Sequence, residues 1–215
     1  MSTSTVGRMR ASSARRPADA ALAMAFLALL LAGCAQEERA APEPAPTPID
    51  DLNTATMQLP RIEFCSLVED SAIADALGGD GVSEAAYGNG DEVELSGVGR
   101  QVVHELGCSW TGEDGASARA WVFARPVSPE FAQTVVATGR TTTGCRTVSG
   151  PEFGTPSSTQ VCDLPTGRSR VRHAGLFGQT WLTCELEATG RQADALRSRA
   201  DQWCVAVANG LDAAR

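Results

Sequence analysis

The chain has 215 residues and no lysine, and its formal net charge at pH 7 is −8. Residues 1–33 hold four of the 18 basic residues and one of the 26 acidic ones, so the remainder carries 14 basic and 25 acidic side chains. An acidic chain is repelled by phosphate, which argues against nucleic acid as a partner and against attachment to a membrane through a basic surface.

A basic N-terminal region precedes an uncharged run from Ala20 to Gly33. The run is shorter than the ~20 residues that a helix needs to cross a bilayer, and it ends in small residues. These features predict a secretory signal peptide over residues 1–33. An uncleaved membrane anchor and a plain secreted protein remain alternatives, and Arg15-Arg16 leaves both Sec and twin-arginine export open.

Cys34 directly follows Leu31-Ala32-Gly33, and this stretch resembles the lipobox of bacterial lipoproteins. The resemblance implies that the chain is cut after Gly33 and that Cys34 carries lipid, with acyl chains such as palmitate. Each buried CH₂ contributes about 0.8 kcal/mol, so two or three long chains would hold the protein on the outer face of the cytoplasmic membrane.

Four prolines alternate with other residues over positions 42–48, a composition that stays extended and cannot build a core. We therefore predict that residues 34–60 form the lipidated cysteine and a proline-rich tether. Residues 61–215 are predicted to form a single extracytoplasmic domain, long enough for its own core. An alternative, that part of the tether packs onto the domain, applies mainly to Ile49–Leu59.

Residues 61–215 show the turn and periodicity signals of a mixed fold. The predicted elements are a short helix over Ala72–Leu77, strands over Gln101–Trp110 and Ala118–Arg125, a helix from Ser128 to Gly139, strands over Thr141–Thr147, Ser158–Leu164, Arg168–Phe177 and Thr180–Ala188, and a helix over about Arg191–Leu211. Gly78–Gly99 is predicted to be a loop with at most a short strand near Val93–Leu95. This order predicts an α+β domain, an antiparallel sheet of about five or six strands with helices packed on it.

Six cysteines follow Cys34, and an even number in an exported chain predicts a disulfide framework. They are Cys65, Cys108, Cys145, Cys162, Cys184 and Cys204. Fifteen connectivities are possible, and pairing in chain order is the simplest. In that pairing the second bridge joins the two arms of a hairpin, and the third ties the last strand to the helix that packs over it.

Short motifs around these cysteines carry a resemblance to known families. The motifs are Cys65-Ser66-Leu67, Cys108-Ser109-Trp110, Trp181-x-x-Cys184 and Trp203-Cys204. The first two resemble actinobacterial lipoproteins that share a cysteine-paired domain of unknown function. The last two are similar to the extracellular sensor domain of a mycobacterial serine/threonine kinase. The resemblance implies an α+β unit outside the cytoplasm with a binding or sensing role, and it supplies no catalytic residue. The Cys145/Cys162 pair departs from both families.

Enzyme and metal motifs are weak in this chain. His104-x-x-x-Cys108 has a ligand-like spacing, but zinc would need reduced thiolates, which an oxidising compartment works against. No Gly-x-Ser-x-Gly is present, and no serine is marked as a partner for His104 or His173. We therefore expect no metal, no cofactor and no catalytic residue.

Arg168, Arg170 and Arg172 alternate, so a strand places their guanidinium groups on one face and His173 on the other. In an acidic domain this strip predicts a site for an anion such as a carboxylate, a phosphate or an acidic partner. The alternative is a solvated face on which the arginines pair with neighbouring Glu and Asp.

Trp110, Trp121 and Trp181 allow two interpretations, stacking on a ligand or packing in the core, and core packing is the one we predict.

The sequence thus predicts a membrane-anchored, sensor-like module that binds a small anionic ligand or an envelope protein. Two alternatives belong to other classes of protein. One is an envelope hydrolase whose site is assembled from residues far apart in the chain. The other is an accessory subunit of a membrane complex.

Overall fold

The computed structural model describes residues 47–95, 99–190 and 193–215. Cys34, the signal peptide and most of the tether lie outside the described residues, so the lipobox prediction stays a prediction. Among the described residues, no helix is long and apolar enough to span a membrane.

The helices and strands follow one another as mixed α and β elements. In chain order the described elements are η1 (Ile49–Asp51), η2 (Cys65–Leu67), α1 (Asp70–Leu77), β1 (Gly81–Tyr87), β2 (Glu92–Leu95), β3 (Gly99–Val102), β4 (Glu105–Gly112), β5 (Ser117–Phe123), α2 (Pro129–Gly139), β6 (Cys145–Val148), β7 (Ser157–Leu164), η3 (Pro165–Gly167), β8 (Arg168–Phe177), β9 (Thr180–Thr189) and α3 (Ala193–Ala213). The η elements are single turns of 3-10 helix.

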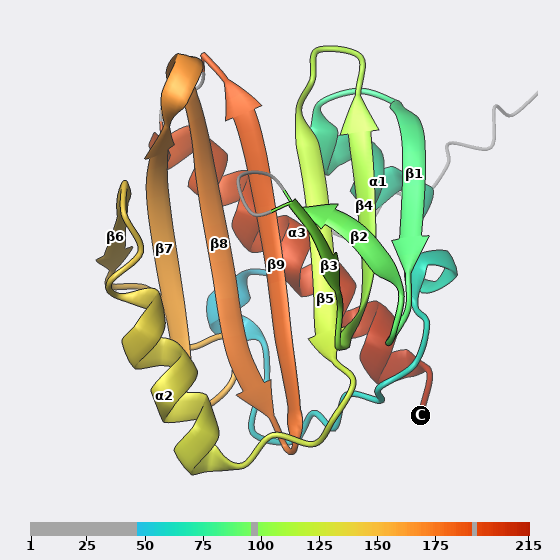
Figure 1. Ribbon diagram of the computed structural model, residues 1–215, viewed down its shortest axis with the longest axis vertical. Helices are drawn as coiled ribbons and strands as arrows, with labels where there is room; N and C mark the ends of the chain where they lie inside the picture. The colour runs from blue at the N-terminus through green and yellow to red at the C-terminus, as the bar shows by residue number, and fades with distance from the viewer. Residues whose placement is uncertain (1–46, 96–98, 191–192) are drawn as a thin grey trace, which may run out of the picture. The chain divides into compact units, whose positions relative to one another are not determined.

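One seven-stranded sheet organises the described part of the chain, in the order β1-β4-β5-β9-β8-β7-β6. Every neighbouring pair in it is antiparallel. Strands β2 and β3 form a separate hairpin, drawn in front of β4 and β5 in Figure 1. The α+β class is confirmed, but the predicted number of strands was wrong, since the sheet has seven rather than five or six.

Helices α1 and α3 cover one face of the sheet, behind it in Figure 1. The core on this face is built from small side chains in the middle of β5, where Ala118, Ala120 and Val122 are fully buried. Small residues there let α3 approach closely, and Trp203 of α3 packs edge-on against Trp110 of β4, with ring centroids 5.3 Å apart. The other face carries α2, which packs with Ala132 and Val136 over one end of β8.

Local signals at turns and helix ends predicted several boundaries correctly. Ser128 caps α2 by accepting a hydrogen bond from the backbone N–H of Phe131 at 3.2 Å. The Asp114-Gly115 turn joins β4 to β5, and Gly115 has the positive φ of 78° that such a turn favours. The last helix covers the predicted range, although residues 191–192 lie outside the described part.

The predicted loop over Gly78–Gly99 is wrong, because this segment contains β1 and β2. Strand β1 is an edge strand that pairs only with β4, and its side chains are exposed on both faces up to Ala86. A strand that buries neither face shows no apolar alternation, so the pattern that predicts strands is missing here. The short strand expected near Val93–Leu95 is present as β2.

Two other boundaries also differ from the prediction. The strand expected over Gln101–Trp110 is broken at Val103 and His104, so that β3 belongs to the hairpin and β4 to the main sheet. The break is stabilised by Val103, whose N–H donates to the carbonyl of Asp91 at 2.9 Å and whose side chain is buried. The strand expected over Thr141–Thr147 is confined to β6, because the turn after α2 continues to Gly144.

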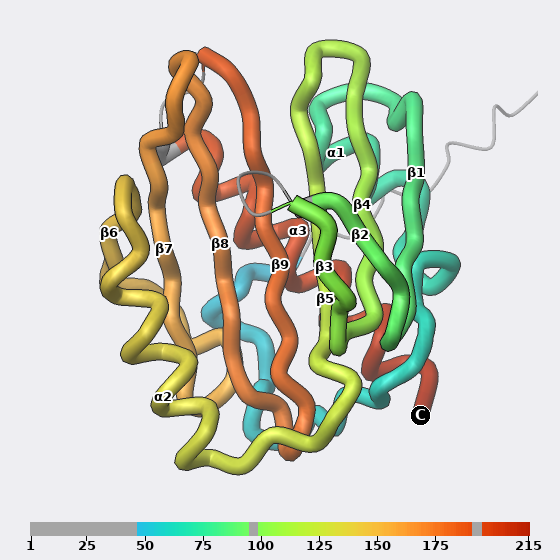
Figure 2. The backbone as a smooth tube through the Cα atoms, viewed as in Figure 1, coloured from blue at the N-terminus to red at the C-terminus, as the bar shows by residue number. Residues whose placement is uncertain are grey.

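The folded part begins before residue 61. Ile49, Met57 and Leu59 are buried in the main core, and η1 contacts α3. Figure 2 shows this segment passing behind β8 and β9 before it continues along the lower edge of the sheet. The alternative that Ile49–Leu59 packs onto the domain is therefore the one the structure has.

Candidate functional site

The predicted arginine strip lies on the sheet face opposite α3. Register brings charged side chains of neighbouring strands beside it, since Arg170 faces Glu187, Arg172 faces Glu185, and Glu185 faces Arg119 of β5. His173 points to the other face, as predicted. We call this cluster the arginine face; its members are Arg119, Arg168, Arg170, Arg172, Glu185 and Glu187.

Glu185 is the centre of the arginine face, and its side chain is only 1 % exposed. Arg172 holds one carboxylate oxygen through Nε at 2.8 Å and Nη2 at 2.7 Å, while Arg119 holds the other through Nη1 at 3.2 Å. A buried carboxylate is stable only when it is paired and hydrogen-bonded, and these two guanidinium groups meet that requirement.

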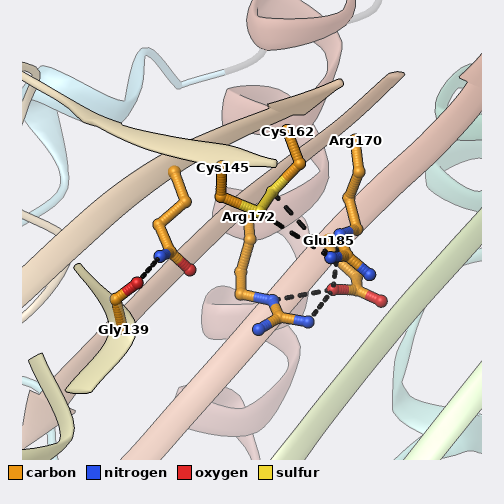
Figure 3. Close-up of a disulfide and its surroundings, with 7 residues drawn as sticks. Gly139, Cys145, Cys162, Arg170, Arg172 and Glu185 are labelled. Atoms are coloured by element: carbon orange, nitrogen blue, oxygen red, sulfur yellow. Dashed lines mark hydrogen bonds and ion pairs between the residues drawn. A yellow bond between two sulfur atoms is a disulfide. The ribbon is translucent and has the colours of Figure 1, made fainter. Parts of the chain in front are cut away.

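Part of the arginine strip pairs with carboxylates of the neighbouring strand, which is the alternative to an anion site. Arg168 Nε lies 2.8 Å from Glu187, and Arg172 is paired as described above. Arg170 differs, since its Nε lies 3.8 Å from the Glu185 oxygen that Arg172 already occupies. Its Nη2 lies 3.8 Å from the sulfur of Cys162 and 4.0 Å from that of Cys145, as Figure 3 shows. Arg170 thus has no carboxylate within hydrogen-bond distance among the described residues.

Trp121 lies between two guanidinium groups of the arginine face. The guanidinium carbons of Arg119 and Arg172 lie 5.5 and 5.3 Å from its ring centroid, which is the geometry of a cation–π contact. The ring is half-buried and therefore does not belong to the core, unlike Trp110 and Trp181, which are 3 % and 1 % exposed. The prediction of core packing is therefore correct for two of the three tryptophans, Trp110 and Trp181.

Tyr87 and Glu105 extend the polar surface toward β1. The Tyr87 hydroxyl donates to Glu105 at 3.0 Å. Burial raises the pKa of the Glu105 carboxyl above its ordinary value, against the opposing effects of the Tyr87 hydrogen bond and of Arg119 and Arg172. Burial also raises the pKa of the Tyr87 phenol. This pair could not be predicted, because Tyr87 lies in the segment that was expected to form a loop.

The six cysteines of the described residues form three disulfides in chain order. They are Cys65–Cys108, Cys145–Cys162 and Cys184–Cys204. The bridge that holds Cys108 leaves no thiolate there for His104, which is exposed at the start of β4. Within the described residues, no group of three or more His, Cys, Asp and Glu side chains could hold a metal ion.

His173 makes contacts that resemble those of a catalytic histidine in a hydrolase. Its Nδ1 lies 3.0 Å from the Thr159 hydroxyl, and its Nε2 lies 2.8 Å from Asp201 of α3. The His173 side chain is fully buried and Thr159 is 5 % exposed, so a substrate does not reach them. This contact joins β7, β8 and α3 and is structural.

Comparisons with known proteins concern the fold alone. No family model matches the chain, and no curated protein matches it. Among solved structures, the chain is similar to the crystal structure of the extracellular domain of PknH from Mycobacterium tuberculosis. The TM-score is 0.47 at 12 % sequence identity, and the match covers 73 % of this chain and 99 % of that one. The extracellular domain of a mycobacterial kinase is also what the Trp181-x-x-Cys184 and Trp203-Cys204 motifs resemble.

Proposed function

We propose that this chain is an extracytoplasmic lipoprotein whose domain binds a small anionic ligand on the arginine face. The observation that carries the proposal is the position of Arg170. Its side chain is 20 % exposed. Within the described part of the chain, its polar contacts are two disulfide sulfurs and a carboxylate oxygen at 3.8 Å that already serves Arg172.

The charge count of the arginine face supports the same proposal. Four guanidinium groups stand against the two carboxylates of Glu185 and Glu187, so the cluster retains positive charge within an acidic chain. A carboxylate or phosphate group of a ligand would offset that charge through charge-assisted hydrogen bonds, which are about twice as strong as neutral ones. Three arginines share the one buried carboxylate of Glu185, and this favours the binding of an additional anion beside them.

Two features support the location. The sequence before Cys34 resembles a lipobox, and three disulfides suit an oxidising compartment outside the cytoplasm. The lipid on Cys34 would hold the domain at the outer face of the cytoplasmic membrane, with the described residues facing small molecules or envelope proteins outside it.

Calorimetric titration of the mature chain with inorganic phosphate and with succinate tests the proposal. We expect saturable binding of at least one of these probes and a loss of at least tenfold in affinity for Arg170→Gln. Arg140→Gln is the matched control, because Arg140 is exposed at the end of α2, outside the arginine face, and should leave the affinity unchanged. Equal affinities for wild type and Arg170→Gln, or no binding of either probe, would contradict it.

A further inference from the structure

An open cavity of about 460 Å³ lies where the chain passes from β5 into α2. This volume falls within the range of pockets that hold small organic molecules. Its lining residues are His104, Glu105, Phe123, Arg125, Pro126, Val127 and Phe131.

Two phenylalanines, Phe123 and Phe131, form aromatic walls of the cavity. Phe131 is 53 % exposed, although the two buried residues of α2 next to it in the helix, Ala132 and Val136, face the sheet. The Ser128 cap fixes the first turn of α2 and with it the position of Phe131. Phe123 is half-buried and rests against Trp181, with ring centroids 6.4 Å apart. A flat apolar group placed between these two rings would cover apolar surface that now faces water.

Arg125 brings a positive charge to the lining of the cavity. Arg125 is exposed, and among the described residues it forms no ion pair. Glu105 lies on the side toward the arginine face, and Arg119 and Arg172 both act on its charge. Glu105 lines the cavity and lies next to the arginine face, so the two adjoin each other.

The strand geometry shows how far apart the two sites lie. Phe123 and Arg119 are on the same face of β5, with Trp121 between them. Four residues of a strand span about 13 Å. A ligand with a ring in the cavity therefore needs a chain long enough to span about 13 Å before its acidic group meets Arg119 and the guanidinium groups around Glu185.

We propose that the ligand of the arginine face is an anion that carries an apolar ring, and that the cavity between Phe123 and Phe131 binds this ring. The inference rests on the proposed function, since it assigns the chemical class of the same ligand. The ring provides affinity through buried apolar area, and the arginines select a negatively charged head.

Four probes separate the contributions: 8-phenyloctanoate, octanoate, 8-phenyl-1-octanol and dodecanoate, each titrated into the mature chain. We expect 8-phenyloctanoate, whose chain is long enough to join the two sites, to bind at least tenfold more tightly than any of the other three. Phe131→Ser should reduce its affinity to that of octanoate, and this exposed position should tolerate the change without loss of folding, as circular dichroism would verify.

The outcomes distinguish the inference from the proposed function. If octanoate binds through Arg170 but 8-phenyloctanoate gains nothing over it, the ring site is wrong while the anion site stands. Equal binding of dodecanoate and 8-phenyloctanoate would also overturn the ring assignment. If 8-phenyl-1-octanol binds as tightly as 8-phenyloctanoate, or if Arg170→Gln leaves every affinity unchanged, the anion site itself is wrong.

Discussion

Glu185 is the residue that sets the character of the arginine face. It is almost completely buried, yet it belongs to the polar side of the sheet, where three guanidinium groups approach it. Neither Glu185 nor Arg119 could be assigned from the sequence, because Arg119 and Glu185 are 66 residues apart and meet only through the β5–β9 register. The alternation of Arg168, Arg170 and Arg172, by contrast, is a property of one strand, and it was predictable.

Removing the charge of Glu185 should destabilise the domain. In Glu185→Gln, Arg119 and Arg172 lose their shared carboxylate and remain close together, so we expect the free energy of unfolding to fall by about 3 kcal/mol. Urea denaturation followed by circular dichroism measures this. Glu92→Gln is the matched control, because the Glu92–Arg100 pair is largely exposed and contributes at most about 1 kcal/mol. A loss no larger than that of the control would show that the three arginines do not depend on Glu185.

Glu105 should make stability depend on pH. Burial raises the pKa of its carboxyl above the ordinary value of 4.5, so the native chain keeps a proton at pH values where the unfolded chain has lost it. Unfolding then releases a proton, and this contribution to the free energy of unfolding decreases as pH rises from 4.5 to the native pKa.

Glu105→Gln lacks this proton and can still accept the Tyr87 hydrogen bond. We expect the stability of wild type minus that of the variant to decrease with pH through this window and to become constant above it. Urea titrations at several pH values measure the difference. A difference that is flat, or that increases with pH, would contradict the raised pKa.

Elements that bury one face were predictable, and elements that bury none were not. Strands β5, β7, β8 and β9 and helices α2 and α3 showed turn, cap or periodicity signals that survive in the structure. Strand β1 is exposed along almost its whole length, so its sequence shows no alternation, and the hairpin that starts with β2 lies outside the main sheet. The cysteine pairs were predictable because each bridge joins elements that are close in the predicted order.

The segment around Phe153 packs closely against Gly175 of β8, so we expect a side chain at position 175 to destabilise the domain. A Cβ at Gly175 would overlap the backbone carbonyl of Phe153, whose side chain is fully buried against Phe177. Gly175→Ala should therefore lower the free energy of unfolding by about 3 kcal/mol, at the upper end for overpacked sites. Gly79→Ala is the control, because a Cβ there meets nothing within 4 Å. Similar stabilities of the two variants in urea denaturation would refute this packing.

The two faces of the main sheet carry different kinds of residues. One face carries the main core, α1 and α3, and the buried His173–Asp201 contact; the other carries α2, the arginine face and the aromatic cavity. Under the proposed function, a local positive cluster on the face with less helical cover would direct small anions to one place in an otherwise acidic chain.

The proposed lipid anchor predicts the covalent state of the mature protein. Intact mass spectrometry of protein purified from its own membrane should give residues 34–215 plus acyl chains, with a gain of about six hydrogens on reduction of three bridges. Cys34→Ala should be released into the medium. Continued membrane retention of that variant, or a mature chain without acyl groups, would contradict lipid anchoring.

The measurement that tests the central claim most directly is nuclear magnetic resonance of the arginine side chains. The Nε–Hε resonances of ¹⁵N-labelled protein would be followed while succinate or phosphate is added. We predict that the resonance of Arg170 shifts saturably and by more than those of Arg119 and Arg172, with Arg140 unaffected. Shifts that are equal for Arg140 and Arg170, or that do not saturate, would show that the arginine face is a paired structural surface rather than an anion-binding site.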